Sequence, residues 1–180
     1  APDGGTLYVA DWFNSRVRSI ALETGVVETV VGSDVASSVD GIGTGASFTG
    51  TIRGLAITPN GHTLIVSDQA GNCVRSIALV TRQMMTLAGT CGTGAGHVDG
   101  KAADARFNAP VGSAVSPDGS TLILADCNNH RVRSIAMASG ATATLAGSGT
   151  AGSTDGTGTA ARFNTPFSVA ILPDGTTAFV

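Results

Sequence analysis

The stretch Gly119-Ser120-Thr121-Leu122-Ile123-Leu124-Ala125-Asp126 decides the fold, because close copies of it occur at Gly4–Asp11 and Gly61–Asp68. Each copy is followed by Val-Arg-Ser-Ile-Ala, at 17–21, 74–78 and 132–136. The glycines Gly4, Gly61, Gly119 and Gly175 open successive copies and are spaced by 57, 58 and 56 residues. Repetition with a period of this order is typical of solenoids, propellers and arrays.

The third unit divides into four short β-type stretches separated by turn-forming residues. These stretches, which we call strands a to d, are expected at 111–115, 121–125, 131–136 and 143–146. Turn residues lie between them at Ser116–Gly119, Asp126–His130 and Ser139-Gly140. No segment of helical length has an apolar period of about 3.6 residues, so parallel βαβ units are disfavoured. The sequence therefore predicts an all-β protein, a β-propeller of four-stranded antiparallel blades that bury both faces by stacking radially.

About three repeats are present, and they form one propeller segment over residues 1–180. The predicted units are 1–50, 51–109, 110–165 and a partial unit at 166–180. A long Gly/Ala/Ser/Thr loop joins each unit to the next, and each loop carries an Asp-Gly pair followed by a phenylalanine at a constant distance. The aspartates are Asp40, Asp99 and Asp155, and the phenylalanines are Phe48, Phe107 and Phe163. Because a free linker would not keep this offset, we expect the loops to pack on the blades with phenylalanine as an anchor.

The composition favours a folded protein and excludes some classes of partner. Hydrophobic residues make up 42% of the chain and charged residues 13%. The net charge is −3 and Lys101 is the only lysine, whereas a nucleic-acid surface needs clustered Lys and Arg. Nucleic acid is therefore a disfavoured partner. No apolar run reaches the length of a membrane span, so no such span is expected.

The three cysteines, Cys73, Cys91 and Cys127, occupy different repeat positions and contain no C-x-x-C pair. We expect small buried or half-buried thiols, neither a disulfide framework nor a zinc site.

The acidic residues are predicted to hold turns. Nine of the eleven aspartates recur at equivalent repeat positions, whereas a catalytic residue is normally needed once. These nine are Asp3, Asp118 and Asp174 in the a–b turn, Asp11, Asp68 and Asp126 after strand b, and Asp40, Asp99 and Asp155 in the long loop. The recurring arginines Arg18, Arg75 and Arg133 of strand c are predicted to make hydrogen bonds between blades.

The remaining titratable residues suggest no reaction centre. His62, His97 and His130 lie in three unrelated turns or loops, and no pair has metal-ligand spacing. The glycine-rich loops lack the strand-to-helix context and the Lys-Ser/Thr pair of a phosphate cradle. We therefore expect no catalytic residue, no metal site and no cofactor, and the sequence favours a protein that is not an enzyme.

The residues Asp126-Cys127-Asn128-Asn129-His130-Arg131-Val132-Arg133, with Asn108–Gly112 upstream, resemble the NHL repeat. The glycine-rich Asp155–Asn164 segment is similar to the long-insertion variant of that repeat. Only the third unit carries the Asn129-His130 pair that gives the family its name. The resemblance covers nearly the whole chain and implies a propeller, usually of six blades.

About three units do not close a ring, because propellers typically have about four to eight blades. The repeat pattern starts and stops within a blade, which favours a segment of a longer propeller. The alternative is a homodimer that forms a six-bladed ring, in which a strand near Ser168–Leu172 of one subunit completes the first blade of the other.

The function favoured by the sequence is a non-enzymatic scaffold that binds a protein or peptide. The b–c turns and the long d–a loops emerge on the same face of an antiparallel propeller, and the repeat is most irregular there. Trp12 and Phe13 are either packed under a loop or displayed as binding anchors. The candidate binding residues are Trp12, Phe13, Asn14, Arg16, Asn128, Asn129, His130 and Arg131. Two alternatives are a fragment of a propeller hydrolase or lyase with its catalytic residues in other blades, and a surface glycan-binding module.

Overall fold

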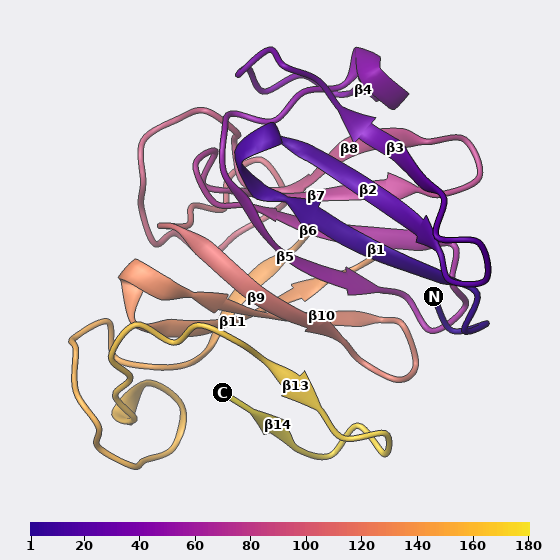
Figure 1. Ribbon diagram of the computed structural model, residues 1–180. Helices are drawn as coiled ribbons and strands as arrows, with labels where there is room; N and C mark the ends of the chain where they lie inside the picture. The colour runs from indigo at the N-terminus through magenta and orange to yellow at the C-terminus, as the bar shows by residue number, and fades with distance from the viewer.

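The computed structural model describes residues 1–180 and consists of antiparallel sheets that stack side by side (Figure 1). Blade 1 contains β1 (Thr6–Asp11), β2 (Arg16–Ala21) and β3 (Val27–Gly32). Blade 2 contains β5 (Ile52–Ile57), β6 (Thr63–Asp68), β7 (Cys73–Ala78) and β8 (Gln83–Ala88), and β4 (Gly41–Ile42) pairs with its outer strand. Blade 3 contains β9 (Pro110–Val115), β10 (Thr121–Asp126), β11 (Arg131–Ala136) and β12 (Thr142–Ala146). Blade 4 begins with β13 (Ala170–Ile171) and β14 (Ala178–Phe179). This architecture confirms the predicted partial propeller.

The helical content is limited to four single-turn 3-10 helices. Two of them, η1 (Trp12–Asn14) and η3 (Cys127–Asn129), form the b–c turns of blades 1 and 3. The other two, η2 (Gly43–Gly45) and η4 (Gly158–Ala160), lie in the long loops. No helix has the length and apolar character needed to cross a membrane.

The strand register repeats from blade to blade. Strands b and c pair over six residues in each of the first three blades, ending with an aspartate opposite the first residue of strand c. In each blade the register of strands c and d then shifts between a valine and an arginine, at Val17/Arg18, Val74/Arg75 and Val132/Arg133. A bulge bends the strand and re-aims the side chain beside it. The three arginines therefore share a backbone position beside the bulge, although Arg75 and Arg133 are buried and Arg18 is partly exposed.

The hydrophobic core lies in layers between neighbouring blades. The largest layer contains Val17 and Val31 of blade 1, Ile52 and Leu64 of blade 2, and Phe48 of the connecting loop. A second layer between blades 2 and 3 is built in the same way around Phe107. Phe48 and Phe107 are fully buried, and Phe163 is half-buried. The long loops thus contribute core residues.

Strands a approach each other closely, and glycine makes this approach possible. A Cβ atom on Gly54 would lie 1.9 Å from the carbonyl oxygen of Val111. A Cβ atom on Gly112 would lie 2.5 Å from the Cα atom of Ser168, and the Gly112 N–H donates to the Phe167 carbonyl over 2.9 Å. The inner strands of blades 2, 3 and 4 are therefore held together backbone to backbone.

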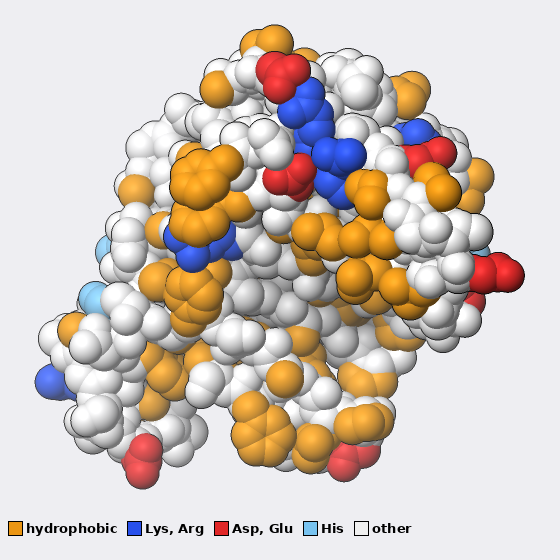
Figure 2. All heavy atoms as spheres, in the orientation of Figure 1, with side chains coloured by type: hydrophobic (Ala, Val, Ile, Leu, Met, Phe, Trp, Pro, Cys, Tyr) orange, Lys and Arg blue, Asp and Glu red, His pale blue; other side chains and the backbone are white.

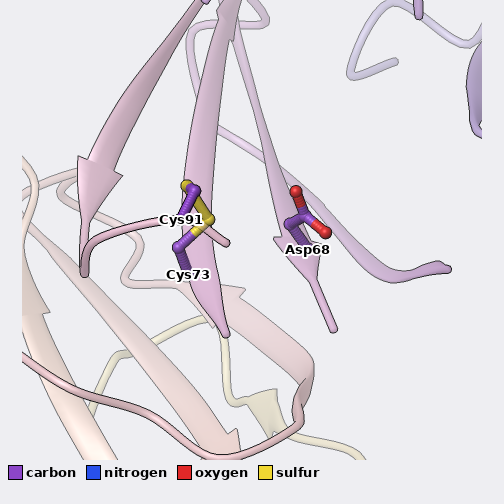
Figure 3. Close-up of side chains that lie close together, drawn as sticks. All are labelled: Asp68, Cys73 and Cys91. Atoms are coloured by element: carbon purple, nitrogen blue, oxygen red, sulfur yellow. A yellow bond between two sulfur atoms is a disulfide. The ribbon is translucent and has the colours of Figure 1, made fainter. Parts of the chain in front are cut away.

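The prediction that the cysteines are separate thiols is wrong for two of them. Cys73, the first residue of β7, forms a disulfide with Cys91 in the long loop after β8 (Figure 3). The number and spacing of the cysteines did not indicate this pair. The two residues meet only because folding places the start of β7 next to the loop that leaves the same blade. Cys127 is a free, buried thiol, and burial raises its pKa.

Candidate binding face

The b–c turns and the long d–a loops lie on one side of the molecule, which we call the turn-loop face. In Figure 1 the b–c turns lie toward the left, and the a–b and c–d turns lie toward the right. A carboxylate at the end of strand b holds each b–c turn. Asn14 Nδ2 donates to Asp11 over 2.9 Å, and Asn129 Nδ2 donates to Asp126 over 2.8 Å. In blade 2 the Gly71 N–H donates to Asp68 over 3.0 Å. These contacts fix the turns of the face.

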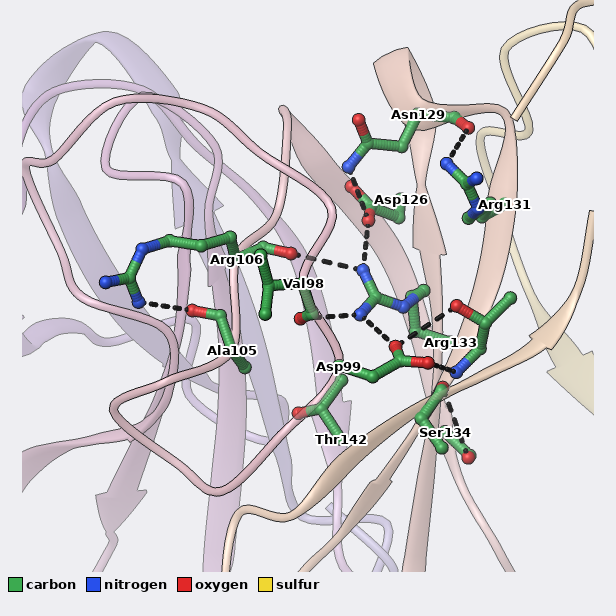
Figure 4. A network of polar contacts seen from close by, with 12 residues as sticks. Val98, Asp99, Ala105, Arg106, Asp126, Asn129, Arg131, Arg133, Ser134 and Thr142 are labelled. Carbon is green, nitrogen blue, oxygen red and sulfur yellow. Dashed lines mark hydrogen bonds and ion pairs between the residues drawn. The ribbon is translucent and has the colours of Figure 1, made fainter. Parts of the chain in front are cut away.

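A second set of carboxylates ties the first two long loops to the blades that follow them. Asp99 accepts hydrogen bonds from Arg133, from the Thr144 N–H at 3.0 Å and from Thr144 Oγ1 at 3.1 Å (Figure 4). Asp40 accepts from Arg75 at 2.6 Å and from the N–H and hydroxyl of Thr86. We call these two groups the clasps. The hydrogen bonds predicted between blades for the strand c arginines differ in the structure: Arg75 and Arg133 bond to the loop that precedes their blade, and Arg18 bonds to Asp11 of its own blade.

The guanidinium of Arg133 is buried, and both of its terminal nitrogens donate to acceptors, whereas its Nε has no hydrogen-bond partner. It donates to Asp99 at 2.5 Å, to Asp126 at 2.7 Å and to the carbonyl groups of Val98 and Arg106 (Figure 4). Burial raises the pKa of Asp126. Burial also acts to raise the pKa of Asp99, but the Thr144 N–H and the guanidinium outweigh it, so this pKa lies below its ordinary value.

Several of the predicted binding residues bond within the molecule. Arg16 pairs with Asp34 over 2.8 Å, and Arg131 donates to the Ser148 carbonyl over 3.0 Å. Asn129 is 8% exposed and donates to the Gly96 carbonyl over 2.6 Å as well as to Asp126. The imidazole Nδ1 of His130 accepts from the Thr165 N–H over 3.0 Å. The structure thus places these four residues where the long loops meet the b–c turns.

The other predicted binding residues, Trp12, Phe13, Asn14 and Asn128, leave more surface open on the turn-loop face. Phe13 is 86% exposed and stacks on Trp12, with ring centroids 4.8 Å apart and planes inclined by 10°. Asn14 and Asn128 are exposed, while Trp12 is half-buried. Phe13 is therefore displayed on the surface, and Trp12 supports it.

A cavity of about 450 Å³ opens beside this aromatic pair, where the inner strands of blades 2 to 4 meet. Its walls include Trp12, Arg53, Val111, Ser113 and Phe167. The Arg53 guanidinium carbon lies 3.8 Å from the centroid of the Trp12 ring and 5.5 Å from that of Phe167. Figure 2 shows hydrophobic side chains above and below a basic one at the left of the hollow in this view.

Sequence reasoning missed Arg53 and Phe167. Arg53, Val111 and Phe167 occupy the same position at the start of strand a in successive units. The residue at this position changes from basic to aliphatic to aromatic between units. This departure from the repeat was the signal in the sequence that could have marked the position as a candidate site residue. The contact of Arg53 with Trp12 could not be read from it.

A third group of polar side chains lies close together at Asp68, Cys73 and Cys91 (Figure 3). The ligand atoms of these residues lie within 4.8 Å of one another. Because the two sulfur atoms are bonded to each other, they supply no thiolate for a metal. Asp68 uses its carboxylate to hold the b–c turn of blade 2.

Solved structures with the same fold are β-propeller proteins. An auxiliary nutrient binding protein from Bacteroides thetaiotaomicron is 20% identical, with a TM-score of 0.71 over 91% of this chain and 39% of that protein. A similar protein from Bacteroides ovatus is 21% identical, with a TM-score of 0.71 over 94% of this chain and 41% of that protein. At this identity the likeness concerns the fold alone. The blades and their shared face thus define a β-propeller segment.

Sequence relatives specify the family. The chain is 30% identical over 134 residues to NHL repeat-containing protein 2 of Bos taurus. This match covers 71% of this chain and 18% of that protein. It is also 30% identical over 147 residues to protein SUPPRESSOR OF QUENCHING 1, chloroplastic, of Arabidopsis thaliana. That match covers 77% of this chain and 14% of that protein. No protein-family model matches the chain. The chain belongs to the NHL-repeat proteins and spans less than one fifth of the length of these relatives.

Proposed function

We propose that this chain is a non-enzymatic interaction scaffold that binds a protein or peptide partner through the turn-loop face. The NHL-repeat propeller points to a protein-interaction scaffold in general terms. The observation that carries the finer proposal is the aromatic pair of Trp12 and Phe13 beside the cavity. This pair occurs in one unit only, so it does not serve the repeat itself. Exposed aromatics next to a cavity are the features that dominate binding energy in protein interfaces.

The roles of the carboxylates support binding over catalysis. Asp11, Asp68 and Asp126 hold the b–c turns, and Asp40 and Asp99 form the clasps. These contacts position loops on a rigid set of blades, which is the usual division between a scaffold and its recognition surface.

The test compares two equally exposed apolar side chains on opposite faces. Phe13 is 86% exposed on the turn-loop face, and Val80 is 88% exposed in the c–d turn of blade 2. Peptides selected from a random display library against the chain should bind Phe13→Ala at least about tenfold more weakly. Val80→Ala should bind them like the unmodified chain. Because both side chains are exposed, neither substitution should lower the thermal midpoint appreciably. Equal affinity of the selected peptides for both variants would exclude the turn-loop face as the binding surface.

A further inference from the structure

The guanidinium of Arg53 has no acidic partner in this structure. The arginines of the clasps each face two carboxylates, whereas Arg53 forms no ion pair. Its Nε donates to the side-chain oxygen of Gln69 over 2.6 Å, and no hydrogen bond engages its terminal nitrogens. Gln69 thus fixes one edge of a half-buried cation at the wall of the cavity.

Arg53 is the only charged residue in the lining of this cavity. Trp12 Nε1, which can only donate, is buried without a partner. The Ser113 hydroxyl is likewise buried without a partner, in a residue that is 9% exposed. No Asp or Glu lines the cavity. The terminal N–H groups of Arg53 are therefore the free donors of this cavity, and they call for a ligand that accepts hydrogen bonds.

The walls beside these donors are apolar. The rings of Trp12, which stacks on Phe13, and of Phe167, which is 55% exposed, both lie near the Arg53 guanidinium. A guanidinium that lies over an aromatic ring still presents its N–H groups in its own plane, where they match the two oxygens of a carboxylate. An acidic side chain flanked on both sides by apolar side chains complements this arrangement of charge and surface.

We propose that the cavity at Arg53 is a recognition site for a glutamate or aspartate side chain within an apolar peptide segment. The inference rests on the proposed function and names the chemistry of its partner. Arg53 supplies the charge and the donors, and the aromatic walls hold the neighbouring residues of the peptide. The site places a positive charge on a protein whose net charge is −3.

Trp12 is the only tryptophan in the chain, so its fluorescence reports on this site directly. The probes are pools of heptapeptides with acetylated and amidated ends, randomised around one fixed central residue. The centre is Glu in the first pool, Gln in the second and phosphoserine in the third. A fourth pool has apolar sequences and a free terminal carboxylate. The Glu pool should change the Trp12 emission saturably and bind at least about tenfold more tightly than the Gln pool.

Arg53→Gln and Arg82→Gln each remove one positive charge, so comparing them separates this site from general electrostatics. Arg53→Gln should abolish the preference for the Glu pool, and Arg53→Lys should retain only part of it because the planar fork is lost. Arg82→Gln is the control, since Arg82 is exposed and pairs with Glu28 over 3.0 Å away from the turn-loop face. It should preserve the preference. Circular dichroism of each variant verifies that the fold is intact.

The remaining outcomes overturn the inference in distinguishable ways. Equal binding of the Glu and Gln pools, with both weakened by Phe13→Ala, would refute carboxylate recognition while the proposed function survives. Tighter binding of the phosphoserine or free-carboxylate pool than of the Glu pool would assign the cavity to another anion. If no pool changes the Trp12 emission while library-selected peptides still lose affinity in Phe13→Ala, the inference is refuted and the proposed function stands.

Discussion

Replacing Asp99 with alanine removes three hydrogen bonds from the clasp of blade 3 and should destabilise the fold by about 2 kcal/mol. The lost partners are the buried guanidinium of Arg133 and the N–H and hydroxyl of Thr144. Removing one member of a fully buried ion pair costs about 3–5 kcal/mol. The value here should be smaller for two reasons. Asp99 is 50% exposed, so water can replace part of the contact, and Asp126 still neutralises Arg133.

Asp155 provides a matched control, because it stands at the same repeat position but makes no hydrogen bond or ion pair in this structure. Urea unfolding followed by circular dichroism would compare Asp99→Ala and Asp155→Ala under identical conditions. For a chain of this size, a loss of about 2 kcal/mol corresponds to a lower thermal midpoint by about 4–8 °C. A difference between the two variants below about 0.5 kcal/mol would refute the assigned role of the clasp.

The same reasoning predicts how the effect depends on pH. The pKa of Asp99 is lower in the folded protein than its ordinary value, so the folded state favours the ionised form. The stabilisation by Asp99 should be complete above the unfolded pKa of about 3.9 and should decline as pH falls toward the lower, folded pKa. The stability difference between the unmodified chain and Asp99→Ala should therefore shrink in acid. A constant difference across that range would contradict the charge-based explanation.

Three further predictions follow from separate features of the fold. Cys91→Ser should cost about 3 kcal/mol in urea unfolding, because the disulfide closes a loop with a sequence separation of 18. Gly54→Ala should destabilise the chain by about 3 kcal/mol or more, since its Cβ would meet the Val111 carbonyl oxygen at 1.9 Å. The pKa of Asp118 should be about 2 by NMR titration, and Ser116→Ala should raise it by removing the largest contribution. The stabilisation by Asp118 should be present above the unfolded pKa of about 3.9 and lost as pH falls toward about 2.

Each of these predictions has a comparison that could contradict it. A reductant should destabilise the unmodified chain but not Cys91→Ser, and an unmodified chain insensitive to reductant would argue against the disulfide. Gly94→Ala is the steric control because no atom lies within 4 Å of the Cβ position, and equal losses for both alanine variants would rule out crowding at Gly54. An Asp118 pKa that does not move in Ser116→Ala would show that the hydroxyl of Ser116 does not hold the carboxylate.

The sequence predicted the features that depend on short stretches of chain. The apolar runs and turn residues around Thr121–Ala125 indicated the strands, because the local pattern recurs in every unit. The offset between Asp99 and Phe107 predicted a packed loop, and Phe107 is fully buried. The repetition of Arg133 in strand c indicated a structural hydrogen-bonding role, although its partner Asp99 belongs to the preceding loop and not to a neighbouring blade.

The tertiary structure decided which residues from different units come together. Cys73 pairs with Cys91 although neither the number nor the spacing of the cysteines indicated it. Arg53 lies beside Trp12 and Phe167, which come from different units, because the radial stacking of blades brings the starts of strands a next to a b–c turn. By itself the sequence determined the repeating unit, since strands and turns follow from interactions between near neighbours. The cavity and its charge arise only when blades pack, because contacts between blades join residues far apart in the chain.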